Sequence, residues 1–387
     1  MRILAVHQKT VALASPMGNA QMSYDEMTGS LVAIVTDVRR DGRQVIGYGF
    51  DSIGRYGHGG LAEERFIPRL LGAAPESLWD EAGRLDPARC LKTMMKNEKP
   101  GGDGERAGAV GLLDMAIWDA LAKAEGVPLW RYLADRYNDG EANRRVWAYG
   151  SGGHYYPGRD VDGLVDELKR YRDLGFQALK MKVAGAPIAE DRRRVEAALK
   201  LMADSTHLAV DACAGQDAPT ARRLISDLAP YKLAWIEEPV EPLDYQGLAE
   251  VARDCPMPIG TGENCFSLAD MKNLVIYGGL RPDRDWLQMD PPLSYGLVEY
   301  LAMIDWLEAH GWSRKRLVPH AGHLFSLNLA VGLGLGGYEC APDPEAISGG
   351  FADGTSVADG RVTPPDHPGI GFEHKPNLWA VFKDLVG

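Results

Sequence analysis

Residues 208–263 read LAVDACAGQDAPTARRLISDLAPYKLAWIEEPVEPLDYQGLAEVARDCPMPIGTGE, and this stretch decides the fold class. Three short apolar segments, Leu208–Asp211, Ala234–Glu237 and Pro258–Glu263, alternate with longer segments that have amphipathic helical periodicity. Apolar strands that alternate with helices are typical of βαβ units in a parallel sheet. The stretch therefore predicts successive β/α units of an α/β protein.

The same alternation extends in both directions along the chain. The further candidate strands are Val146–Gly150, Ala178–Val183, Trp286–Asp290, Leu317–His320 and Gly337–Cys340. Eight strands with helices between them fit a closed barrel better than an open sheet. We therefore predict a modified (β/α)8 barrel of the TIM type, with the catalytic barrel domain over residues 141–341.

The segment before the barrel has a different pattern. Ser30–Asp37 and Gln44–Phe50 are rich in strand-forming residues and flank a short turn, which predicts a hairpin. Ala107–Glu125 has helical periodicity. These features predict an α+β capping domain over residues 1–140, and we expect the Gly- and Pro-rich tail, residues 342–387, to return to this cap.

Charge and composition argue against several classes of protein. The chain has 387 residues, and its 42 basic and 54 acidic residues give a net charge of −12. This balance argues against nucleic acid or an anionic membrane as the main partner. The five cysteines, without a CxxC, argue against a disulfide framework or a zinc site. With no long apolar stretch and no signal-peptide core, we expect a soluble cytoplasmic protein.

Three acids end successive predicted strands. Asp211, Glu237 and Glu263 follow one another at intervals of 26 residues, about one β/α unit. Active sites of such barrels form at this edge, so the three side chains should converge. Converging carboxylates need a cation, and oxygen ligands suit Mg²⁺ better than zinc. The alternative is three ordinary loop acids. Glu238 should point to the opposite side of its strand.

Two lysines lie two residues apart in the predicted strand ALKMKV. Lys180 and Lys182 therefore share one face of the strand. Two buried cations beside a metal lower each other's pKa, and a neutral lysine can serve as a base. The alternative is a solvated pair on an edge strand, which a barrel covered on both faces disfavours.

The remaining candidates end later strands. His320, in LVPHAGH, follows Asp290, in LQMD, by one strand. An aspartate bonded to a histidine fixes its tautomer and raises its pKa, which suits an acid or base. Glu339, in GGYEC, is either an ordinary surface acid or a protonated donor to a developing oxyanion. For His323 we expect a structural role.

Together these motifs resemble the enolase superfamily, in its mandelate racemase/muconate lactonizing enzyme branch. KMK, VD, IEEP, GTGE, QMD and PHAGH occur in the order and spacing of that branch, and the resemblance covers nearly the whole chain. Within the branch, the stretches GRYGHGG, NEKPGGDGER and RPDRDWLQ resemble the D-tartrate dehydratase group. The resemblance implies a barrel whose N-terminal cap is completed by the C-terminal tail, and a homo-oligomer.

A role for each site residue is also implied by this resemblance. The Mg²⁺ ligands would be Asp211, Glu237 and Glu263. Lys182 would take the proton α to the substrate carboxylate, and Lys180 would be its electrostatic neighbour. His320, with Asp290, would protonate the leaving hydroxyl, and Glu339 would help to stabilise the enediolate.

The implied activity is that of a hydro-lyase. An acid sugar or other small hydroxy acid would lose its β-hydroxyl and become a 2-keto acid. Glycine-rich loops at Gly18 and Gly54–Gly60 are predicted to close over the site. Two alternatives remain open. Lys182 and His320 could exchange an α-proton without elimination, as in a racemase or epimerase. The second alternative is a barrel that binds acid sugars without turnover. It is motivated by the changed Gly18 loop and by Cys213, which stands where the family usually has asparagine.

Overall fold

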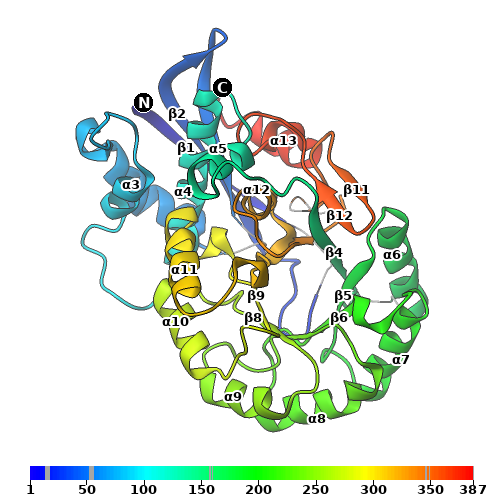
Figure 1. Cartoon of the computed structure of the whole chain (residues 1–387). Helices are drawn as coiled ribbons and strands as arrows, with labels where there is room; N and C mark the ends of the chain where they lie inside the picture. The colour runs from blue at the N-terminus through cyan, green and yellow to red at the C-terminus, as the bar shows by residue number, and fades with distance from the viewer. Residues whose placement is uncertain are drawn as a thin grey trace.

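The computed structural model describes residues 1–13, 18–51, 56–156, 158, 160–344, 347 and 349–386. Gly54, part of a predicted lid loop, lies outside these residues. Figure 1 shows a ring of helices around a central set of strands, with an antiparallel sheet and further helices packed against one side. The predicted combination of α/β barrel and α+β cap is confirmed.

Three antiparallel strands form the sheet of the cap, in the order β1 (Ile3–Ala12), β2 (Thr28–Arg40) and β3 (Arg43–Phe50). The β2–β3 hairpin agrees with the prediction. Sequence patterns missed β1, whose side chains are all half-buried or exposed and do not alternate strictly. Its apolar residues therefore give no strong periodic signal.

Helix α4 (Glu105–Glu125) packs across β3 at very short range. A Cβ atom added to Gly47 would lie 2.0 Å from the carbonyl oxygen of Ala116, and one added to Gly49 would lie 2.1 Å from that of Leu112. Only glycine allows the helix backbone to approach the strand this closely. The other cap helices are α1 (His58–Leu61), α2 (Ile67–Leu71), α3 (Pro87–Met94) and α5 (Leu129–Tyr137), with a π-helical turn at Ala62–Phe66.

Parallel strands line the barrel. They are β4 (Val146–Gly152), β5 (Ala178–Lys182), β6 (Leu208–Asp211), β7 (Ile236–Glu237), β8 (Ile259–Thr261), β9 (Trp286–Leu287) and β10 (Tyr338–Cys340). The strand predicted at Leu317–His320 is reduced to a parallel bridge between Leu317 and Leu287, because the chain enters a helical turn at His320. Pairing of β10 with β4 completes the ring.

Each strand from β4 to β9 is followed by a helix on the outside of the barrel, and a further helix, α12 (Leu324–Gly332), follows the Leu317 bridge. The helices after β4 to β9 are α6 (Val161–Asp173), α7 (Ile188–Leu199), α8 (Ala218–Leu228), α9 (Tyr245–Asp254), α10 (Leu268–Tyr277) and α11 (Leu297–Ala309). Several begin at a side chain that accepts from the first-turn amides: Asp160 at α6, Asp217 at α8, Asp244 at α9 and Ser267 at α10. Such caps fix where the preceding loops end, at the edge that carries the site.

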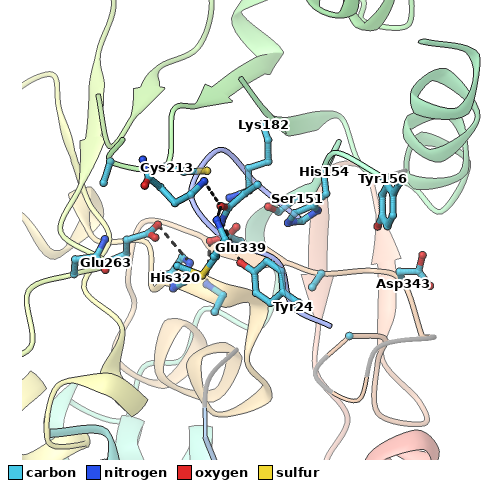
Figure 2. A pocket seen from close by; sticks show the side chains of 18 of the residues that line it. Tyr24, Ser151, His154, Tyr156, Lys182, Cys213, Glu263, His320, Glu339 and Asp343 are labelled. Atoms are coloured by element: carbon cyan, nitrogen blue, oxygen red, sulfur yellow. Dashed lines mark hydrogen bonds and ion pairs between the residues drawn. The ribbon is translucent and has the colours of Figure 1, made fainter. Parts of the chain in front are cut away.

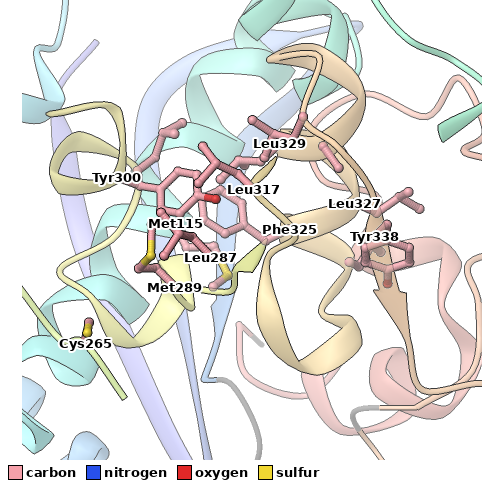
Figure 3. Packing of buried hydrophobic residues seen from close by; sticks show 14 of the residues in the cluster. Met115, Cys265, Leu287, Met289, Tyr300, Leu317, Phe325, Leu327, Leu329 and Tyr338 are labelled. Carbon is pink, nitrogen blue, oxygen red and sulfur yellow. The ribbon is translucent and has the colours of Figure 1, made fainter. Parts of the chain in front are cut away.

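One hydrophobic core spans the cap and the barrel. Met115 of α4 is fully buried in the same cluster as Met289, Tyr300 and Phe325 of the barrel, and Figure 3 shows these side chains packed together. The Nε2 atom of His323 lies 2.9 Å from the carbonyl oxygen of Phe50 in β3. The cap is therefore held rigidly over the barrel.

The C-terminal tail first pairs with the barrel and then reaches the cap. Strands β11 (Ser356–Ala358) and β12 (Arg361–Thr363) form a hairpin, and β12 pairs with β4. Gly369 forms a bridge with Pro128, and α13 (Pro376–Phe382) follows. The tail thus returns to the cap as expected, while the domain boundaries stay a prediction.

Among the residues that the structure describes, no helix combines the length and apolar character needed to cross a membrane. The oligomeric state and the cellular location stay predictions from the sequence.

Candidate active site

Three carboxylates meet at the C-terminal edge of the barrel strands, as the spacing predicted. Asp211 ends β6, Glu237 ends β7, and Glu263 follows β8 by two residues. One oxygen from each lies within 4.8 Å of the others. Asp211 and Glu237 are paired directly in the strand register and are almost completely buried.

The three carboxylates fit a hard divalent cation. They offer only oxygen ligands, which suit Mg²⁺. The Oε2 atom of Glu263 is buried and makes no hydrogen bond, although it lies 3.3 Å from the Nε2 atom of His320. Burial of a carboxylate oxygen costs free energy unless a hydrogen-bond donor or a cation contacts it. The Oε2 atom of Glu263 therefore suits a position beside a bound cation.

Glu237 is oriented by groups beneath it in the barrel. Its Oε2 atom accepts from Trp235 Nε1 at 3.0 Å and from Gln288 Nε2 at 2.7 Å, and Lys180 pairs with its Oε1 atom. Asp211 is oriented by the Cys213 amide, which donates to its Oδ1 atom at 2.8 Å. The ligand positions are therefore set before any ion binds.

Glu238 is not one of the three carboxylates that lie within 4.8 Å of one another. It adopts a left-handed backbone conformation with φ of 43°. Its side chain accepts from Thr261 Oγ1 at 2.5 Å and from the Gly262 amide at 2.8 Å. Glu238 thus holds the turn that carries Glu263.

Both lysines of β5 contact carboxylates. Lys182 Nζ lies 2.5 Å from Asp211 Oδ2, and Lys180 bridges Glu237 and Glu339. Burial lowers the pKa of each lysine, but Asp211 for Lys182 and Glu237 for Lys180 hold these pKa values well above the usual value. In these contacts each ammonium touches an anion, which raises the lysine pKa, and the lowering expected beside a bound metal ion stays a prediction.

His320 and Asp290 form the pair expected from the sequence. The Nδ1 atom of His320 lies 3.0 Å from Asp290 Oδ2, at the base of the site. Burial lowers the pKa of His320, but Glu263 and Asp290 outweigh burial and raise the pKa to about 9. With Nδ1 occupied by Asp290, the Nε2 atom is the one that faces Glu263.

Glu339 lies inside the site, in the middle of β10, and not on the surface. Its Oε1 atom is 2.9 Å from Lys180 Nζ, and its Oε2 atom accepts from the Ala321 amide at 3.0 Å. Burial favours the neutral form, but Lys180 and His320 lower the pKa of Glu339 to about 2. The prediction of a protonated Glu339 is therefore wrong, because two cations stabilise its ionised form.

A cavity of about 320 Å³ lies above these groups. Figure 2 shows Lys182, Glu263, His320 and Glu339 gathered in one part of it. The opposite part is lined by three residues that sequence reasoning missed, which are His154, Tyr156 and Asp343. The available signal for His154 was its place directly after a glycine pair at a strand end.

Both departures from the family pattern lie at this cavity. Cys213 lines it, and burial raises the pKa of its thiol. Gly18 pairs with Tyr155 beside it, and the residues that follow contribute Gln21 and Tyr24 to the wall. The N-terminal segment therefore covers the barrel mouth.

The sequence profile of the enolase C-terminal domain-like family matches residues 163–378. This chain belongs to the enolase superfamily. It is 27% identical to L-talarate/galactarate dehydratase of Salmonella typhimurium LT2 over 370 residues. The match covers 93% of this chain and 85% of that enzyme. It is 30% identical over 349 residues to 3,6-anhydro-alpha-L-galactonate cycloisomerase of Streptomyces coelicolor, covering 86% of this chain and 85% of that enzyme.

Solved structures of the superfamily have the same fold. The crystal structure of L-talarate dehydratase from Polaromonas sp. JS666, complexed with Mg and L-glucarate, superposes with a TM-score of 0.75. The identity is 28%, and the match covers 96% of this chain and 94% of that one. The resemblance to the superfamily seen in the sequence is thus confirmed.

Proposed function

We propose that this superfamily member is a Mg²⁺-dependent acid-sugar dehydratase, which converts a 2,3-dihydroxy acid into a 2-keto acid and water. One observation carries the proposal. A carboxylate triad within 4.8 Å lies in contact with Lys182 through Asp211 and with His320 through Glu263. A candidate base, a candidate acid and a cation site therefore meet at one cavity.

Asp211, Glu237 and Glu263 would hold the ion. When bound, Mg²⁺ supplies positive charge that offsets the second negative charge developing on the substrate carboxylate. Lys180 would add a fixed positive charge beside it, held in place by Glu237 and by the ionised Glu339. Charge that is already in place stabilises a transition state without further reorganisation.

Lys182 is the proposed base for the α-proton. Its amine reaches the cavity from the end of β5 and pairs with Asp211. To accept a proton the amine must be neutral, so Lys182 has to leave this ion pair and release its own proton to solvent when the substrate binds. The electron pair of the broken C–H bond then passes into the enediolate of the substrate.

His320 is the proposed acid for the leaving group. Asp290 holds its Nδ1 atom and orients its Nε2 atom toward the cavity. Transfer of a proton to the β-hydroxyl breaks the C–O bond and releases water, and the resulting enol tautomerises to the 2-keto acid. An aspartate in this position fixes the productive tautomer.

Substrate profiling of the Mg²⁺-loaded protein tests this function. The panel contains stereoisomers of tartrate, which the D-tartrate dehydratase resemblance indicates and which would give oxaloacetate, together with galactonate, galactarate and talarate. We expect a 2-keto acid from at least one of them, lost with a chelator and restored by Mg²⁺. Inversion of C2 without keto acid would instead establish a racemase. Absence of both keto acid and exchange of the α-proton in D₂O would refute the proposal.

A further inference from the structure

His154 lines the cavity, although none of the roles described above uses it. It lies two residues after the end of β4, at the same barrel edge as the carboxylate triad. Figure 2 shows its ring near Ser151 and Lys182, on the side of the cavity that leads to Tyr156. This position places the imidazole beside the path of a bound substrate.

The backbone before His154 is fixed by buried charged groups. The Gly153 amide donates to Glu167 Oε1 at 3.1 Å, and the Gly153 carbonyl accepts from Arg194 Nη2 at 2.6 Å. Gly153 has φ of 62°, and a Cβ atom there would lie 2.7 Å from the Cβ atom of Met181. Glycine is therefore required at this turn, and the turn presents His154 at one defined point.

The chain after His154 and the ring itself are also held. The Tyr155 amide donates to the Gly18 carbonyl at 3.0 Å. The imidazole packs edge-on against Tyr24, with ring centroids 6.3 Å apart, and against Tyr156, at 6.5 Å. Within the described residues its ring nitrogens form no hydrogen bond. Their hydrogen-bonding capacity is therefore open to a molecule in the cavity.

The imidazole carries no charge at neutral pH. Burial, followed by the charge of Lys182, lowers the pKa of His154 to about 3. A neutral imidazole has one nitrogen that donates and one that accepts. A hydroxyl group also donates and accepts, whereas a carboxylate only accepts. The partner that matches His154 is therefore a hydroxyl.

We propose that His154 is a substrate-binding residue that selects a hydroxyl on C4 of the acid, an inference that rests on the dehydratase function proposed above. Lys182 defines the position of C2, and His320 defines the leaving group on C3. Figure 2 shows that the lining residues of the cavity run from Lys182 past His154 to Tyr156 and Asp343. The next carbon of the chain, C4, is the one that comes to His154.

Three four-carbon acids isolate this contact. 2,3-Dihydroxybutyrate, 2,3,4-trihydroxybutyrate and tartrate share the reacting C2–C3 diol and differ at C4, which is a methyl, a hydroxymethyl or a carboxylate group. All stereoisomers are assayed for kcat/KM with Mg²⁺. We expect the protein to prefer the hydroxymethyl over the methyl acid by about tenfold or more, because the imidazole in the cavity wall is left without a partner when the hydroxyl is missing.

Substitutions of His154 then assign the preference. His154→Phe keeps the aromatic packing but removes both nitrogens, so the hydroxymethyl-to-methyl ratio of kcat/KM should fall to about one. His154→Gln should keep most of the ratio, because a carboxamide also donates and accepts. His207→Phe, a histidine outside the cavity, should leave the ratio unchanged. A role in packing alone would preserve the ratio in His154→Phe.

An unchanged ratio in His154→Phe overturns the proposal, as does a preference of the unaltered protein for the carboxylate of tartrate. Should His154→Phe fail to melt cooperatively, His154→Leu takes its place. If none of the three acids is dehydrated, the affinities of the Mg²⁺-loaded protein for the hydroxymethyl and methyl acids are measured by calorimetry. These affinities then test whether His154 binds the C4 hydroxyl. A binding preference that His154→Phe abolishes supports the contact even though the dehydratase function fails. Equal binding, or no binding, refutes it.

Discussion

Lys182 Nζ lies 2.5 Å from Asp211 Oδ2, so the proposed base and a proposed metal ligand form an ion pair with each other. The two residues stand directly opposite in the register of β5 and β6. Because the ammonium of Lys182 pairs with a carboxylate oxygen of Asp211, substitution of either residue alters the surroundings of the other. The base and the metal site must therefore be distinguished by separate measurements.

Lys182→Ala should abolish turnover and retain Mg²⁺ binding. Loss of a positioned base lowers kcat by about 10²–10⁴-fold. The triad is intact in this variant, so the Mg²⁺-induced rise in melting temperature should remain. Keto-acid formation and thermal unfolding are measured side by side, with the exposed Lys200→Ala as the control. An active Lys182→Ala protein would contradict the assignment of the base.

Asp211→Asn should weaken Mg²⁺ binding. Removing one anionic ligand should cost more than the roughly 10–100-fold in affinity that loss of an outer hydrogen-bond partner costs. Titration calorimetry with Mg²⁺ measures the effect, and Asp227→Asn, an exposed position on α8, is the matched control. Equal affinity in Asp211→Asn and the unaltered protein would exclude Asp211 as a ligand.

Asp290→Asn should separate the two proton transfers. Asp290 contacts the Nδ1 atom of His320, the proposed acid, whereas Lys182, the proposed base, pairs with Asp211. We therefore expect kcat for keto-acid formation to fall by about 10²–10⁴-fold, while exchange of the substrate α-proton in D₂O continues. Proton NMR follows both processes in one sample, and the exposed Asp305→Asn is the control. Parallel loss of exchange and elimination would disprove the division of roles.

Lys123→Met should destabilise the docking of the tail on the cap. Lys123 pairs with Asp119 at 2.6 Å and also with Glu373 of the tail, and Asp119 is completely buried. Removing one partner of a buried pair costs about 3–5 kcal/mol, because the other charge stays buried without compensation. Urea unfolding measures the loss, and Lys92→Met on the exposed face of α3 is the control. A change below about 0.5 kcal/mol would mean that this network contributes little.

Asp114 should make stability depend on pH. This fully buried residue of α4 accepts from the Leu297 amide at 2.6 Å, and burial raises its pKa to about 8. Its pKa in the unfolded chain is about 3.9, so between these values the folded state binds more protons than the unfolded state. The contribution of Asp114 to stability is therefore complete below about pH 4 and declines as the pH rises toward about 8, by at most about 1.4 kcal/mol per pH unit.

Asp114→Asn lacks this titration while it can still accept from Leu297. In urea unfolding at pH 5 and pH 8, the unaltered protein should lose stability relative to Asp114→Asn. Identical pH profiles for the two proteins would show that Asp114 is ionised in the folded state.

Most of the barrel could be predicted from the sequence, because its pattern is local. A strand of a covered barrel is an apolar run, and the helix after it has its own periodicity, so β4 to β8 were predicted to within a few residues. The strand expected at Leu317–His320 was an exception. There the apolar run is present, but the turn at His320 leaves only one bridge to β9.

Sequence patterns could not predict β1 or the wall of the cavity. The strand β1 is half exposed and gains its hydrogen bonds only from β2, so its own residues carry little signal. Tyr24 reaches the cavity from the cap, and His154 reaches it through the Gly153 turn. Such neighbours come from distant parts of the chain, and no spacing rule connects them.

By itself, the sequence determined the fold class and the convergence of Asp211, Glu237 and Glu263, because acids one β/α unit apart must end neighbouring strands of the same barrel edge. Only the tertiary structure decided which charges these acids meet. The ionised state of Glu339 and the raised pKa of Lys182 depend on contacts of a few ångströms between different strands. Electrostatic energies change steeply over such distances, and the order of residues along the chain does not contain them.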